Sequence, residues 1–109
     1  MTKVVIRKNS DGEYKGFELC GHAGSGEYGK DIVCAAISML TINTVNSIEQ
    51  FTEDAISCEA DPEAGHILLS AENGFSKEGE LLMKSYELGI MSVFKQYGNE
   101  FLDIKFEEV

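Results

Sequence analysis

The chain has 109 residues, enough for one domain around one hydrophobic core and too few for two. Its 19 acidic and 9 basic residues give a net charge of −10, which argues against direct binding to nucleic acid and favours a basic partner. No stretch approaches the roughly 18 apolar residues of a membrane-spanning helix, so no membrane partner is expected.

The N-terminus lacks the apolar core and small-residue cleavage site of a signal peptide. The chain also has three cysteines, an odd number, which does not suggest a disulfide framework. Both features predict a cytoplasmic protein with reduced thiols, in which each cysteine needs its own explanation as buried filler, metal ligand or nucleophile.

The chain begins with a pattern typical of a β-hairpin. Residues 4–8 and 14–20 are rich in β-forming side chains and flank a turn at 9–12 that contains Asp-Gly. The next ten residues, 21–30, include four glycines, so we expect a mobile loop rather than a helix or strand.

A helix is predicted from Asp31 to about Phe51, with Asp31 as its N-cap. Its apolar stripe, at three- and four-residue spacing, is expected to comprise Ile32, Ala35, Ala36, Met39, Ile42 and Asn43. Residues 55–60 and 66–71 then form a second strand pair around a turn with Pro and Gly.

A second helix is expected to begin after a Ser76 cap and to end at Gly98. Its stripe, interpreted as core or subunit interface, comprises Met83, Tyr86, Ile90, Val93, Phe94 and Tyr97. Residues 101–106 alternate as a last strand. The order β-β-α-β-β-α-β predicts a single α+β layered domain, residues 1–109, with two helices packed on a mostly antiparallel sheet.

Cys34 is the candidate nucleophile. A cysteine attacks well only as a thiolate, so its pKa must be lowered. With Asp31 as N-cap, Cys34 occupies the third position of the helix, where free backbone N–H groups and the positive end of the dipole favour negative charge. On the residues alone, a small buried cysteine is the competing interpretation.

His22 is the candidate base. The chain has two histidines, and His22 lies at the start of the glycine loop that leads back to Cys34. A loop of that length can fold back, and the unperturbed pKa of histidine lies near neutrality. We assign no role to His66.

The residues around this pair carry a resemblance to a known family. The pattern is G-H-A from Gly21, a glycine loop with Gly24, and then G-x-D-I-V-C-A-A-x-S from Gly29 to Ser38. This pattern resembles the signature of the ribosomal-processing cysteine protease Prp family, whose strand-helix order is similar across the whole chain. The resemblance implies a homodimeric endopeptidase that removes a short N-terminal extension, ending in aromatic residues, from the 27th bacterial large-subunit ribosomal protein.

The resemblance also implies roles for single residues. His22 is the base and Cys34 the nucleophile, while Asp31 and Ser38 match further signature positions. Asp31 either caps the helix or orients His22, and Ser38 either bonds the carbonyl of residue 34 or helps to hold the thiolate. From its glycines, we expect the loop from Gly24 to Gly29 to close over an extended peptide. Tyr28 either lines the pocket, stacks on the aromatic side chains of the substrate, or is a loop residue without a role in binding.

Two other interpretations remain open. Cys20, His22 and Cys34 could hold a zinc ion, although their spacing matches no familiar zinc pattern and lacks a fourth ligand. Alternatively, the chain is a non-enzymatic binding module for a basic ribosomal protein or an assembly factor. The protease interpretation needs no cofactor or metal ion. It leaves Cys20 as a strand residue near the site and Cys58 as a buried strand residue.

Overall fold

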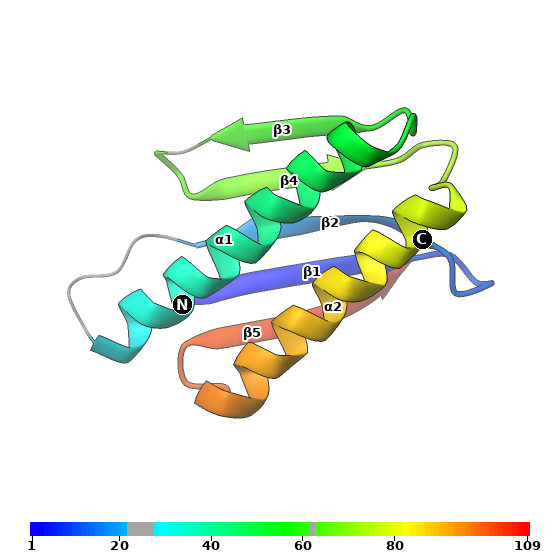
Figure 1. Cartoon of the computed structure of the whole chain (residues 1–109). Coiled ribbons are helices and arrows are strands. Elements are labelled where there is room, and N and C mark those ends of the chain that lie inside the picture. Colours follow the sequence, from blue (N-terminus) through cyan, green and yellow to red (C-terminus); the bar gives the residue numbers. More distant parts are fainter. Residues whose placement is uncertain (22–27, 62) are drawn as a thin grey trace.

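A computed structural model describes residues 1–21, 28–61 and 63–109, and the side chains of residues 28–31 lie outside that description. Five strands form one sheet in the order β3-β4-β2-β1-β5. The strands are β1 (Thr2–Lys8), β2 (Tyr14–Cys20), β3 (Ser57–Asp61), β4 (His66–Ser70) and β5 (Leu102–Glu108). The helices α1 (Tyr28–Phe51) and α2 (Lys77–Tyr97) lie side by side over one face of the sheet (Figure 1).

The predicted element order is confirmed, and the sheet is mixed. The pairs β1–β2, β2–β4 and β3–β4 are antiparallel, while β1 and β5 run parallel. A parallel pair needs a long crossover. Between β1 and β5 the chain passes through β2, both helices and the β3–β4 hairpin.

The second helix and its caps are as predicted. Ser76 accepts a hydrogen bond from the Gly79 N–H through its side chain, and the N–H of Gly98 donates to the Phe94 carbonyl at the other end. The stripe meets the core with its Met83, Tyr86 and Ile90 buried. Serine before an apolar periodic run and glycine after it therefore located this helix well.

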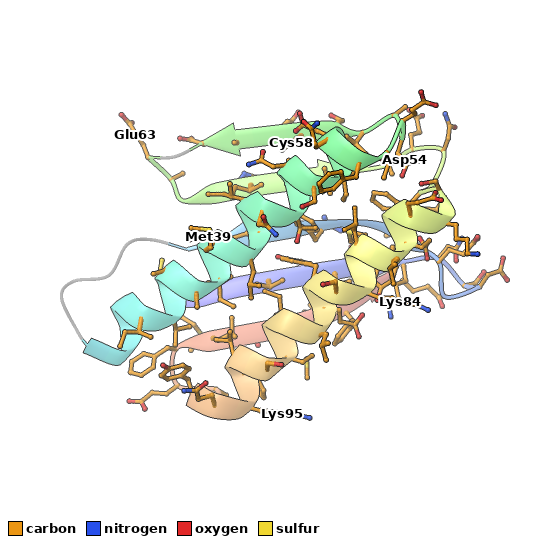
Figure 2. The ribbon with its side chains drawn as sticks, viewed as in Figure 1. Met39, Asp54, Cys58, Glu63, Lys84 and Lys95 are labelled. Atoms are coloured by element: carbon orange, nitrogen blue, oxygen red, sulfur yellow. The ribbon has the colours of Figure 1, made fainter. Side chains whose placement is uncertain are left out.

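The predicted stripe of α1 is wrong. Among the side chains of this helix that the structure describes, residues 32–51, the buried ones are Val33, Ile37, Thr41, Thr44, Val45 and Ile48. The predicted stripe instead faces outward, with Met39 68% and Ile42 48% exposed (Figure 2). α1 has apolar residues on both faces, so periodicity alone did not select the inner one.

The inner face of α1 includes two threonines, so a search for apolar residues did not recognise it. The hydroxyls of Thr41 and Thr44 donate to the carbonyls of Ile37 and Leu40 within the helix, so both side chains are buried without loss of a hydrogen bond. The Thr41 hydroxyl also lies 2.9 Å from the hydroxyl of Tyr86, which ties α1 to α2. Burial raises the pKa of Tyr86 to about 12, so this phenol stays protonated at neutral pH.

The expectation about membrane-spanning segments also needs correction. The segment Ile32–Phe51 is long and apolar enough to cross a bilayer by length and composition alone. It passes this test because no charged residue lies between Ile32 and Ile48. In the fold its inner face closes the core, which is also how a core helix of a water-exposed domain behaves.

The assignment of the inner face can be tested with two isoleucines of α1. We expect Ile37→Ala to lower the free energy of unfolding by about 2–5 kcal/mol because it leaves a cavity in the core. Ile42→Ala should cost about 1 kcal/mol or less, because that side chain is half exposed. Urea unfolding at two protein concentrations measures both and separates folding from self-association. A larger loss of unfolding free energy for Ile42→Ala than for Ile37→Ala would show that the stripe predicted from the sequence is the buried one.

Candidate active site

Cys34 lies in the second turn of α1, half-buried beside the fully buried Val33. Because α1 begins at Tyr28, Cys34 is its seventh residue and not the third. Asp31 is correspondingly inside the helix and is not its N-cap. The prediction that Cys34 sits among the free N–H groups of the first turn is therefore wrong, and the helix dipole, which acts within the first turn, contributes little to a thiolate there.

The earlier start of α1 has a physical reason. Aspartate before an apolar run is a local signal, whereas a helix already held by packing extends backward until a residue stops it. No proline occurs between Tyr28 and Asp31, and Gly29 costs only about 1 kcal/mol inside a helix. Tyr28 and Gly29 consequently belong to the first turn of α1 and not to a loop.

Several predicted site residues lie outside what the structure describes. His22 and Gly24 are in the segment 22–27, and the side chains of Tyr28 and Asp31 are also outside the description. Ser38 is half-buried one turn beyond Cys34. The role of His22 as the base, the closure of the loop from Gly24 to Gly29, and the roles of Asp31 and Ser38 therefore stay predictions.

Gly21 has a visible structural role. Its N–H donates to the carbonyl of Gly65 at 3.0 Å, which continues the β2–β4 contact by one residue beyond Cys20. A Cβ atom at position 21 would meet the Thr2 side-chain oxygen at 3.1 Å, a close contact that glycine avoids. Glycine at this position therefore lets the chain leave the sheet close to Thr2 of β1 while it stays hydrogen-bonded to Gly65.

The other two cysteines are exposed. Cys20 ends β2 as predicted, on the sheet face that carries no helix, because Phe17 and Leu19 point into the core and side chains alternate along a strand. Cys58, predicted to be buried, is exposed because β3 is an edge strand, exposed along its whole length (Figure 2). Partial burial and the charge of Glu49 raise the pKa of the Cys58 thiol.

Sequence analysis missed a polar cluster that includes His66. Nε2 of His66 lies 2.6 Å from Oε2 of Glu18, and NH2 of Arg7 donates to Oε1 of the same carboxylate at 2.9 Å. The hydrogen bonds from His66 and Arg7 lower the pKa of Glu18. Alternation along β2 could have placed Glu18 on one face with Cys20, but no sequence signal showed that β4 pairs with β2 and brings His66 beside them.

β2 ends and α1 begins at the same end of the molecule, so Cys20, Gly21 and the Cys34 turn share that end (Figure 1). The predicted base His22 follows Gly21 directly in the sequence.

Comparison with known proteins identifies the family. The profile of the family described as Cysteine protease Prp matches residues 1–101. The ribosomal processing cysteine protease Prp of Staphylococcus aureus (strain Mu50) is 29% identical over 97 residues, which cover 89% of this chain and 92% of that protein.

Two crystal structures from S. aureus share the fold. The essential ribosomal processing protease Prp in complex with a substrate peptide aligns with a TM-score of 0.90 and 27% identity, covering 98% of this chain and 100% of that one. The structure with a covalently linked product peptide aligns with a TM-score of 0.87 and 28% identity, with the same coverage. The present chain belongs to the cysteine protease Prp family and is a cysteine protease.

Proposed function

We propose that this protease removes a short N-terminal extension from the 27th protein of the bacterial large ribosomal subunit, cleaving after an aromatic residue in the cytoplasm. The observation that carries the proposal is the uninterrupted signature from Gly21 to Ser38, which includes His22 and Cys34, in a chain matched by the family over residues 1–101. The S. aureus relatives named for ribosomal processing, one of them bound to a substrate peptide, support this class of substrate.

The proposed chemistry uses two residues. His22 takes the proton of the Cys34 thiol, and the sulfur attacks the scissile carbonyl carbon to give a tetrahedral oxyanion. The peptide C–N bond then breaks, His22 gives its proton to the leaving amine, and a thioester to Cys34 remains. Water, deprotonated by His22, hydrolyses the thioester and returns the thiol. A relative with a covalently linked product peptide supports an acyl-enzyme route.

The position of Cys34 makes the base more important than the sequence suggested. In the second turn of a helix, half-buried, a thiol gains little from the helix dipole. In a Cys-His pair the imidazole takes the thiol proton, and the imidazolium that forms stabilises the thiolate. We therefore propose His22 as an essential member of the pair.

The protease proposal is tested with the extended ribosomal protein as substrate and mass spectrometry of the products. We expect Cys34→Ala and His22→Ala each to lower the cleavage rate by at least about a thousandfold, because the residues of such a unit act together. Cys58→Ser, on the exposed edge strand, is the matched control and should cleave at the wild-type rate.

Undiminished cleavage by Cys34→Ala would contradict the proposal. Tight binding of the substrate by the wild type without any cleavage would favour the non-enzymatic binding module instead.

We propose further that the protein is a homodimer joined through the outward face of α1. Met39 is 68% and Ile42 48% exposed on this face, and residues 32–48 carry no charge. An uncharged apolar face suits a second copy of the chain, since the rest of a surface with net charge −10 repels an identical molecule. We therefore assign the contact surface of the homodimer that the family resemblance implies to the outward face of α1.

The dimer is tested by light scattering coupled to size-exclusion chromatography. Met39→Asp places a charge in the proposed interface and should convert the dimer to a monomer. Leu88→Asp, on α2 at a position that is 70% exposed, is the matched control and should stay dimeric. A monomeric wild type, or dissociation by Leu88→Asp alone, would contradict the assignment.

A further inference from the structure

Three side chains of the kinds that bind transition metals meet on the helix-free face of the sheet. Glu18 and Cys20 come from β2, and His66 comes from β4. Their ligand atoms all lie within 4.8 Å of one another, and among the residues that the structure describes this is the one such group of three or more. This cluster lies on the opposite face of the sheet from α1 and Cys34.

The sheet itself brings these residues together. Glu18 and Cys20 are two apart on β2, so their side chains point to the same face. Cys20 is the direct partner of His66 in the antiparallel β2–β4 pair, which places these two side chains next to each other. The three donors are therefore held by rigid strands and not by a loop.

A second layer of contacts orients the carboxylate. NH2 of Arg7 holds Oε1 of Glu18 at 2.9 Å, and Oε1 of Glu107 accepts from Nε of Arg7 at 3.3 Å. Oε2 of Glu18 is thereby aimed at His66, with Nε2 of the imidazole 2.6 Å away. Metal sites use this kind of outer partner to fix a ligand and to set its charge.

We propose that Glu18, Cys20 and His66 form a binding site for a thiophilic divalent transition ion, with zinc as the best fit. A thiolate, an imidazole nitrogen and a carboxylate oxygen are the three kinds of ligand that zinc takes in proteins. Magnesium and calcium are disfavoured because they prefer oxygen ligands alone. Binding would separate His66 Nε2 and Glu18 Oε2 from 2.6 Å to about 3.3 Å, the edge of a tetrahedral site, and draw the exposed Cys20 sulfur inward.

The fourth ligand would be water, or Asp61 after a movement of its side chain, since Asp61 is not among the residues whose ligand atoms lie within 4.8 Å of one another. Asp61 is the cross-strand partner of His66 on β3, on the same sheet face. One of its oxygens accepts from the Ala64 N–H, which leaves the other for an ion. An ion ligated by Cys20 would also fix the end of β2, two residues before His22, so zinc should raise the thermal unfolding midpoint.

The site is tested by titrating Co²⁺ into a Cys34→Ala/Cys58→Ser protein, in which Cys20 is the one thiol. A thiolate-to-cobalt charge-transfer band in the near ultraviolet, displaced by zinc, is expected. Adding Cys20→Ser should abolish the band. His66→Gln and Glu18→Gln should each weaken the apparent affinity by at least about tenfold. Glu59→Gln, which alters a carboxylate elsewhere on the same sheet face, is the matched control and should change nothing.

Three results would overturn the proposal. One is the absence of a band in the Cys34→Ala/Cys58→Ser protein. Another is an affinity that neither His66→Gln nor Glu18→Gln changes, which indicates binding to an exposed thiol alone. The last is a band that His22→Ala abolishes and His66→Gln leaves intact, which would assign the ion to Cys20 and His22. Zinc-dependent thermal unfolding of the single Cys20→Ser variant provides an independent check, since its midpoint should no longer respond to zinc.

Discussion

The packing of the inner face of α1 against the middle of the sheet determines where the candidate nucleophile lies. Val33 and Ile37 of α1 are fully buried in one cluster with Val4 of β1 and with Phe17 and Leu19 of β2, the middle strand. Cys34 stands between these two anchors in the sequence, so its backbone is fixed by core packing rather than by the helix end. The bond between Thr41 and Tyr86 adds a polar contact between the two helices deeper in the same layer.

This constraint changes the account of how the thiol becomes reactive. A nucleophile in the first turn of a helix can draw on free N–H groups, whereas one in the second turn cannot. We therefore assign the proposed activation of the thiol to His22, which follows Gly21 in the sequence, and not to the start of α1. Gly21 lies directly after β2, where its bond to Gly65 sets the course of the chain toward His22.

Much of the fold followed from local sequence signals. The Asp-Gly turn, the Ser76 cap and Gly98 each have one favoured structure, so the first hairpin and α2 were predicted correctly. The inner face of α1 was predicted wrongly. Thr41 donates its hydroxyl to the Ile37 carbonyl within the helix, so this polar residue is buried there. The start of α1 was missed because a cap signal is weaker than helix propagation through Gly29. For the site, the motif predicts Cys34 as the nucleophile, and that assignment stays a prediction. The Glu18–His66 contact depends on strand pairing, which single-sequence patterns do not encode.

The proposed activation of Cys34 by His22 is tested most directly by the rate at which the Cys34 thiol is alkylated. Iodoacetamide is applied near neutral pH with a chelator present, and the rate at each cysteine is followed by peptide mass spectrometry. Cys20 is the comparison, because it is exposed while Cys34 is half-buried. We predict that Cys34 reacts faster than Cys20 despite its lower exposure, and that His22→Ala removes this advantage without changing the rate at Cys20. A Cys34 that reacts more slowly than Cys20 in the wild type would contradict the account.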